Sequence, residues 1–389
     1  MKRIISYASL LTAAAVTLCS FSCSKVEPDD EVTTAEGITL SVDKDVIKCD
    51  GNDAATFTVK ADDGTVIKEG VTFFDADMNE LDIKDFRFTT TEAGEYTFWA
   101  AYKTFNSDSK NPVRVRAINA TAPSIVADPK PESKSFVRRV FISQFTGTGC
   151  GFCPSMVYIM KNAFAKNNLD GKYVLAASHS YNTNDPAYIS SPNAGNFGGT
   201  GYPYLALDMA VGYGDYASES KFTQIFNARY NAEQAKVGIS ANPKFEAALL
   251  PNASGGKDDC ILVRVQVKAA EAGEYTVGAW LLEDKIYGKQ TDGQGIKNLD
   301  PDHDYDTHNN CVRVADSKNG TTWLGHSLGR IEAGKTAEKT FLLKVNKAWK
   351  MENMHMAIFV AAANEKGQYS VNNVIDCPVD KPTPFEYAN

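Results

Sequence analysis

Several common functional patterns are missing from this 389-residue sequence. It has no block of basic residues and a formal net charge of −8, which argues against non-specific nucleic-acid binding, because phosphates require basic partners. It also has no glycine-rich phosphate loop, no GxSxG nucleophile motif and no HExxH zinc motif. No motif therefore indicates a nucleotide, a metal or another cofactor. With 43% hydrophobic and 23% charged residues, the composition is that of an ordinary globular protein.

The first 22 residues have the pattern of an export signal. Lys2 and Arg3 precede IISYASLLTAAAVTL, an apolar segment that is too short to span a bilayer with margin. The stretch SFSC resembles the cleavage box of bacterial lipoproteins, which predicts removal of residues 1–22 and a lipid on Cys23. An ordinary secretory signal, cut nearby, is the alternative. Export places the protein where disulfides persist.

Residues 23–34 are polar and acidic, and they predict a flexible tether behind the lipid. Acidic residues at this place resemble the surface-export signals of Bacteroidetes lipoproteins. We therefore expect a protein that is anchored in the outer membrane by its lipid and faces the cell surface or the periplasm.

Four segments follow the tether, and changes in periodicity separate them. Residues 35–119 contain short alternating runs such as ATFTVKA and predict an immunoglobulin-like β-sandwich. Residues 120–135 are rich in proline, alanine and serine and predict a linker. Residues 136–236 alternate strands with helices and predict a thioredoxin-like α/β domain, and residues 237–389 predict a second β-sandwich. The predicted fold class is thus multidomain α+β.

One short segment, EAGEYT, occurs in both β regions, at 92–97 and at 271–276. In each copy a tyrosine, Tyr96 or Tyr275, follows a turn glycine by two residues. A tyrosine in this position predicts a tyrosine corner, in which the hydroxyl holds a sandwich loop. We interpret the repeat as shared sandwich chemistry rather than as a duplication.

The segment GTGCGFCP places Cys150 and Cys153 between the predicted strand VFISQF and a predicted helix. Backbone N–H groups at a helix N-terminus favour a thiolate, so Cys150 is the expected nucleophile and Cys153 the resolving thiol. A bridge that closes only four residues restricts the unfolded chain by about 2 kcal/mol, against about 3 kcal/mol for fifteen residues. Such a bridge is better suited to reversible exchange than to stabilisation.

A second element of a thioredoxin-type site is a cis-proline loop that faces the sulfurs. Pro203 in GYPYLALD has the expected place, and Tyr202 is predicted to offer its backbone to a substrate strand beside Cys150. The strand VFISQF has no acidic residue to accept the proton of the resolving cysteine. His179 on the next predicted strand is a candidate substitute, although a single histidine on a strand is more often structural.

Other uses of these residues stay open. A zinc site needs four ligands, and no second CxxC is present; a purely structural disulfide is the stronger alternative to exchange. Cys260 and Cys311 are candidates for a bridge across the second sandwich, Cys377 is an alternative partner for either, and Cys49 has no obvious partner. The carboxylates that alternate over residues 300–306 are typical of a solvated acidic loop and less so of a Ca²⁺ site.

From about residue 136 onward the chain resembles the outer-membrane-protein-28-like family of Bacteroidetes lipoproteins. The resemblance rests on FTGTGCGFCP, VLAASHS, GYPYLALD, VGAWLLEDKIYGKQ, HNNCVRV and VNNVIDCPV. It implies a thioredoxin-like domain followed by a β-sandwich and an anchor at the outer membrane, while it leaves the reaction open.

Two functions follow as hypotheses from these patterns. The first is thiol–disulfide exchange on exported proteins, with Cys150 and Cys153 as catalytic residues, Tyr202 and Pro203 as substrate-binding residues, and Cys23 as the lipid anchor. The alternative is a non-enzymatic surface protein that binds a glycan or a protein and uses the thioredoxin-like fold as a scaffold.

Overall fold

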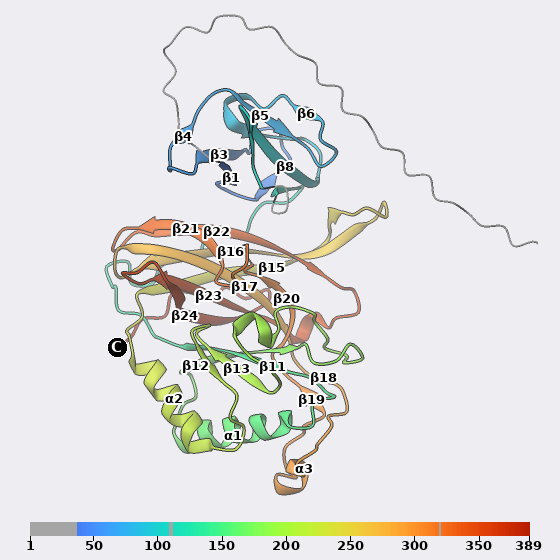
Figure 1. Cartoon of the computed structure of the whole chain (residues 1–389), viewed down its shortest axis with the longest axis vertical. Helices are drawn as coiled ribbons and strands as arrows, with labels where there is room; N and C mark the ends of the chain where they lie inside the picture. Colours follow the sequence, from blue (N-terminus) through green and yellow to red (C-terminus); the bar gives the residue numbers. More distant parts are fainter. Residues whose placement is uncertain (1–36, 109–111, 319) are drawn as a thin grey trace, which may run out of the picture.

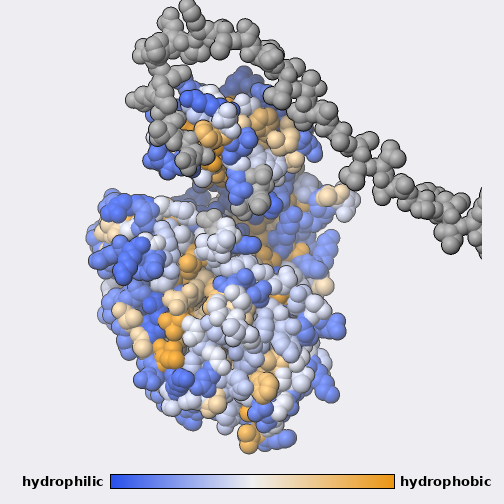
Figure 2. Space-filling model, viewed as in Figure 1, coloured by the Kyte–Doolittle hydropathy of each residue, from blue (hydrophilic) through white to orange (hydrophobic). Residues whose placement is uncertain are grey.

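The computed structural model describes residues 37–108, 112–318 and 320–389 (Figure 1). The predicted signal peptide, the lipidated Cys23 and the tether 23–34 lie outside the described residues. Within the described parts the chain is mostly β, with 24 strands and three α-helices. In these same parts no helix is long and apolar enough to cross a membrane. The face drawn in Figure 2 is mostly polar, with small scattered apolar patches.

Residues 38–106 and 113–118 contain the strands of two sheets around one apolar core. Alternation explains the packing: in Ala55–Ala61, the longest strand of the four-stranded sheet, every second side chain is buried in the core. Phe57 lies at the centre of the core, with its ring centroid 5.2 Å from that of Phe73 and 4.8 Å from that of Phe98. The strands are β1 (Ile38–Val42), β2 (Val46–Lys48), β3 (Ala55–Ala61), β4 (Val66–Ile67), β5 (Val71–Phe74), β6 (Glu80–Leu81), β7 (Arg87–Phe88), β8 (Gly94–Tyr102), β9 (Phe105–Asn106) and β10 (Val113–Ile118).

The rest of the chain begins with alternating strands and helices and continues almost entirely as strands. The first part holds β11 (Val140–Thr146), α1 (Cys153–Lys166), β12 (Tyr173–His179), β13 (Tyr204–Leu207), β14 (Val211–Tyr213) and α2 (Glu219–Asn231). The second part holds β15 (Val237–Pro251), β16 (Lys257–Ala269), β17 (Gly273–Glu283), β18 (Ile286–Tyr287), α3 (Ile296–Leu299), β19 (Thr307–His308), β20 (Cys311–Asp316), β21 (His326–Ile331), β22 (Thr336–Val345), β23 (Met354–Ala363) and β24 (Tyr369–Pro378).

The predicted fold class is wrong, because the structure shows no central α/β thioredoxin-like domain. Strands β11–β14 belong to a nine-stranded sheet in the order β14-β13-β11-β12-β20-β17-β23-β24, with β21 paired to β17. Strand β12 joins β20 through the parallel pair Ala177–Cys311, and β20 pairs in turn with β17. The two predicted units therefore share one sheet. Local periodicity could not reveal this, because the joining pair lies 134 residues apart.

Two halves of this sheet lie face to face. Phe141 on β11 stacks on Phe359 of β23 with ring centroids 5.0 Å apart, and it meets Trp280 of β17 edge-on at 5.2 Å. The opposite face of β11–β14 packs against α1 and α2 through Met156, Phe222 and neighbouring apolar residues. Figure 1 shows the resulting layers: the helices, the β11–β14 half, the β17–β23–β24 half and a further sheet.

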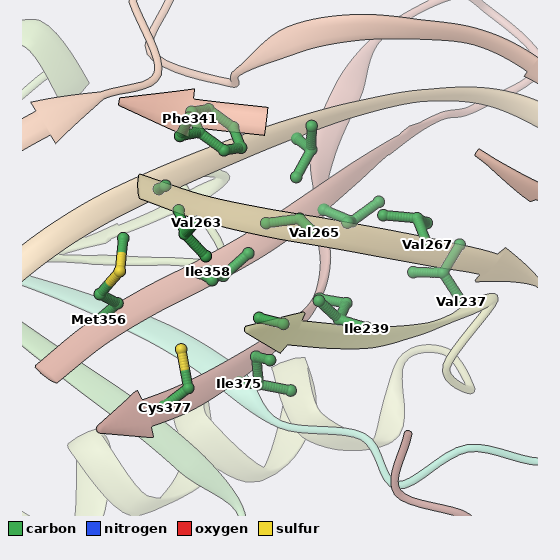
Figure 3. Packing of buried hydrophobic residues seen from close by; sticks show 14 of the residues in the cluster. Val237, Ile239, Val263, Val265, Val267, Phe341, Met356, Ile358, Ile375 and Cys377 are labelled. Carbon is green, nitrogen blue, oxygen red and sulfur yellow. The ribbon is translucent and has the colours of Figure 1, made fainter. Parts of the chain in front are cut away.

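That further sheet has three strands in the order β15-β16-β22. Its inner face carries Val263, Val265 and Phe341, which pack against Met356 and Ile358 of β23 (Figure 3). Every residue of β23 except the last is buried, so this strand packs on both of its faces. The largest apolar core thus lies away from the helices.

Both predicted tyrosine corners are confirmed. The hydroxyl of Tyr96 donates to the carbonyl of Glu92 at 2.9 Å, and that of Tyr275 donates to the carbonyl of Glu271 at 2.7 Å. The two EAGEYT segments therefore make the same loop contact at the start of long strands in different sheets.

Candidate functional site

The site is centred on a disulfide between Cys150 and Cys153, whose Cα atoms are 5.4 Å apart. The pair follows β11, and α1 begins at Cys153, so the predicted position between a strand and a helix is confirmed. Both cysteines are buried, with 2% and 1% of their surface exposed. Phe152, between them, is 44% exposed and lies beside the ring of Tyr216 at 5.4 Å.

The structure brings Pro203 to the same end of the sheet. Phe145 pairs with Tyr204, so Pro203 lies next to the end of β11, where the loop to the cysteines begins. The peptide bond between Tyr202 and Pro203 is cis. The Tyr202 ring lies 5.4 Å from that of Tyr181. The binding roles of Tyr202 and Pro203 stay predictions.

The loop that carries the disulfide is tightly enclosed by residues 181–182. The Gly149 amide donates to Asn182 Oδ1 at 3.0 Å. A Cβ atom on Gly147 would lie 2.7 Å from Cβ of Tyr181, which is closer than side chains normally approach. A glycine is therefore required at position 147 so that the loop can pass beneath Tyr181.

Gln290, between β18 and α3, holds the disulfide loop from the other side. Its Nε2 lies 3.0 Å from the carbonyl oxygen of Cys150, 3.2 Å from that of Thr148 and 3.3 Å from that of Gly147. The Gly293 amide adds a hydrogen bond of 2.8 Å to the Gly151 carbonyl. Sequence reasoning missed this role. The available signal was the family resemblance, because Gln290 is the last residue of the VGAWLLEDKIYGKQ segment on which that resemblance rests.

His179 lies at the end of β12 in a buried chain of polar groups. Its Nδ1 is 2.9 Å from Oδ2 of Asp185, and its Nε2 is 3.6 Å from Sγ of Cys311. Both ring nitrogens therefore contact groups other than Cys153, and the structure gives no contact for the predicted proton transfer to His179 from that cysteine. A catalytic role of His179 is not supported by these contacts.

Asp185 links this chain to the disulfide loop. Its carboxylate accepts hydrogen bonds from the amides of Thr148 at 2.6 Å and Ala187 at 2.8 Å. Burial alone would raise the pKa of Asp185, but the hydrogen bonds from His179 and the two amides outweigh it and hold the pKa at about 2. The carboxylate is therefore ionised at every physiological pH and fixes the start of the loop.

The other described cysteines, Cys49, Cys260, Cys311 and Cys377, are free thiols. The considered bridges among Cys260, Cys311 and Cys377 are absent from the described structure. Burial raises the pKa of Cys260 to about 11, and it also raises the pKa values of Cys311 and Cys377. These three thiols are protonated at neutral pH, which makes them poor nucleophiles.

A pocket of about 260 Å³ opens beside Cys153. Mostly apolar residues of α1 line one part of it, the end of β11 and alternate residues along β12 line a second part, the floor, and residues 303–310 line a third. Among the lining residues are Gln144, Thr146, Cys153, Val157, Met160, Lys161, Phe164, Leu175, His179, Gln290, His303, Tyr305, His308 and Asn310.

The acidic segment over residues 300–306 is partly solvated, with Asp302 and Asp304 exposed, and it also contributes His303 and Tyr305 to this pocket. Asp300 accepts hydrogen bonds from Lys161 Nζ at 2.5 Å and from the Tyr305 hydroxyl at 3.0 Å, and Asp306 pairs with Lys297 at 2.5 Å. In the parts of the chain that are described, no group of three or more His, Cys, Asp or Glu residues could hold a metal ion.

Comparison with known proteins adds no functional assignment. The sequence matches no family model and no curated protein, so the resemblance to the outer-membrane-protein-28-like family stays a prediction. Among solved structures, HBP35 of Porphyromonas gingivalis, a Bacteroidetes protein, is similar at 14% identity, covering 64% of this chain and 78% of that one with a TM-score of 0.48.

Two further structures are more distant. The sporulation control protein Spo0M of Bacillus subtilis is 10% identical over 37% of this chain and 50% of its own, with a TM-score of 0.20. The adhesin InvE of Yersinia pseudotuberculosis is 8% identical over 88% of this chain and 58% of its own, with a TM-score of 0.16. All three TM-scores are too low for an argument about fold or function.

Proposed function

We propose that this protein is an exported lipoprotein, anchored through Cys23, that exchanges disulfides with exported proteins at Cys150 and Cys153. The observation that carries the proposal is the position of the disulfide at the start of α1, with Cys153 among the residues that line the pocket. Helix N-termini stabilise thiolates, and a bridge this short adds little stability.

The exchange has two steps. In the reduced protein, the Cys150 thiolate attacks one sulfur of a substrate disulfide, so that a mixed disulfide forms and the first substrate sulfur leaves as a thiolate that takes a proton from water. The Cys153 thiolate then attacks Sγ of Cys150 and releases the second substrate sulfur. The substrate gains two electrons and the protein disulfide is restored. The reverse sequence oxidises a substrate dithiol.

A second candidate function is favoured by one observation, the burial of Cys150 and Cys153 at the loop that Gln290 holds. Under this alternative the disulfide is structural, and the protein binds a ligand at the cell surface without a redox reaction.

The test compares two variants in the reduction of a disulfide-containing protein by dithiothreitol. Cys150→Ser should abolish acceleration, and Cys153→Ser should trap a mixed disulfide with the substrate that mass spectrometry detects. Circular dichroism and thermal unfolding control for the fold. Equal acceleration by the wild type and the Cys150→Ser variant would reject exchange and leave the binding function.

A further inference from the structure

The pocket beside Cys153 has a polar floor without partners of its own. Gln144 is 4% exposed and lines the pocket, yet its side-chain amide has no hydrogen-bond partner among the residues that the structure describes. Thr146, two residues further along β11, is 6% exposed and also lines the pocket, and its hydroxyl likewise lacks a partner in the described chain. Neither group is sealed from solvent in the described structure, so both can be reached from the pocket, where a ligand or ordered water can bond to them.

The strand register explains why these groups meet. Val140, Ile142, Gln144 and Thr146 alternate along one face of β11, the face that packs against α1. The first two are apolar and belong to the core with α1. The last two replace apolar side chains at the carboxyl end of the strand, where His179 lies opposite Thr146 on parallel β12. The carboxyl ends of parallel strands are a preferred place for ligands.

The titratable side chains around the pocket are paired, neutral or exposed to solvent. Lys161 is paired with Asp300 at 2.5 Å. Burial lowers the pKa of His303 and, with help from the neighbouring His179, the pKa of His308, so these two imidazoles are neutral at pH 7. Asp304 lies on the exposed rim, where water screens its charge. No unpaired charge from the described residues faces the buried part of the pocket.

The size and the walls define the ligand further. A volume of about 260 Å³ is just below the range of about 300–1,000 Å³ that is typical for drug-sized ligands. Val157, Met160, Phe164 and Leu175 supply an apolar wall. The Gln144 amide presents a donor and an acceptor side by side, and the matching group is another amide.

We propose that this pocket binds a small uncharged molecule in which an apolar ring or chain carries a carboxamide, with the carboxamide on Gln144 and Thr146. Binding here does not require the disulfide to exchange electrons, so the site goes beyond the proposed function. The apolar part of the ligand lies against Met160 and Phe164 of α1.

Benzamide is a suitable probe, because benzoate and benzylamine have nearly the same shape but carry a charge. Isothermal titration with the mature protein should show saturable binding of benzamide at millimolar concentration and at least about tenfold weaker binding of both charged analogues. Equal or tighter binding of benzoate or benzylamine, or no binding of benzamide, would overturn the proposal.

Two variants locate the binding. Gln144→Leu keeps the side-chain size and should weaken benzamide binding about tenfold, because one or two hydrogen bonds are lost. Ser143→Ala is the matched control, since Ser143 is equally buried on the opposite face of β11 and should leave the affinity within about twofold. Val157→Trp, at a half-buried position, should block the pocket without altering Gln144. Binding that survives both Gln144→Leu and Val157→Trp would place the ligand elsewhere and refute the site.

Discussion

The two halves of the nine-stranded sheet differ in what they bury. Strand β23 in one half buries nine consecutive residues, and all of them except His355 are apolar. Strands β11 and β12 in the other half also bury most of their residues, but Gln144, Thr146 and His179 are among them. The half with β23 also buries Asn372, Asn373 and Glu283, but backbone carbonyls or Arg313 bond to these side chains. Gln144 and Thr146 instead direct polar groups without a described partner toward the pocket beside the disulfide. Polar burial of this kind is the physical sign that separates a site from a core.

The largest expected effect on the free energy of unfolding comes from breaking the contact between the two halves of the nine-stranded sheet. Trp280 is fully buried against Phe141, and its Nε1 donates to Ser317 Oγ at 2.8 Å. Trp280→Ala should lower the free energy of unfolding by about 3–5 kcal/mol in urea titrations, because it leaves a large cavity. Tyr287→Ala is the control, since Tyr287 is 71% exposed and its loss should change stability by less than about 0.5 kcal/mol. A loss below about 1 kcal/mol for Trp280→Ala would show that the halves do not share a core.

The next effect concerns the one polar side chain of β23. Burial disfavours charged His355, but the carboxylates of Asp284, 3.4 Å from Nε2, and Asp376, 2.6 Å from Nδ1, raise its pKa to about 9. A raised pKa stabilises the fold fully below the unfolded value near 6.5, and this stabilisation is lost as the pH rises through 9. Wild-type stability should fall by roughly 3 kcal/mol over this window. His355→Gln should flatten the dependence in urea titrations from pH 6 to 10, and an unchanged slope would contradict the ion pairs.

The stability of the other half, which carries the disulfide loop after β11, should show the opposite pH dependence. Because the pKa of Asp185 is held at about 2, below its ordinary 3.8, its contribution is complete above pH 4 and is lost as the pH falls through 2. The loss should be roughly 2 kcal/mol, and Asp185→Asn should remove it. Unfolding measured between pH 2 and 5 decides this prediction. If variant and wild type lose stability in parallel, Asp185 is not the group that responds to acid.

The smallest expected effect on stability is at Gln290. Gln290→Leu removes the hydrogen bonds to the disulfide loop and should cost about 1 kcal/mol of unfolding free energy. It should nevertheless speed the reduction of the disulfide by dithiothreitol several-fold, because the loop can then open. Alkylation followed by mass spectrometry gives the rate. Unchanged reduction would mean that Gln290 does not control access to the sulfurs.

The sequence predicted the local features of the site well. The apolar spacing of α1, the alternation of β11 and the CxxC pattern depend on neighbouring residues, so the position of Cys150 and Cys153 was predictable. The two tyrosine corners were predictable for the same reason. The pairing of Ala177 with Cys311 and the contact of Gln290 with Cys150 join residues more than 130 positions apart. No local pattern encodes such contacts, which is why the shared sheet and the pocket were missed.

The most direct test of the exchange function is a redox titration of the mature protein, with differential alkylation of Cys150 and Cys153 measured by mass spectrometry. Exchange predicts a midpoint in the range of known exchange proteins, about −120 to −270 mV. A midpoint below about −300 mV, typical of structural disulfides, would contradict exchange and favour the binding function.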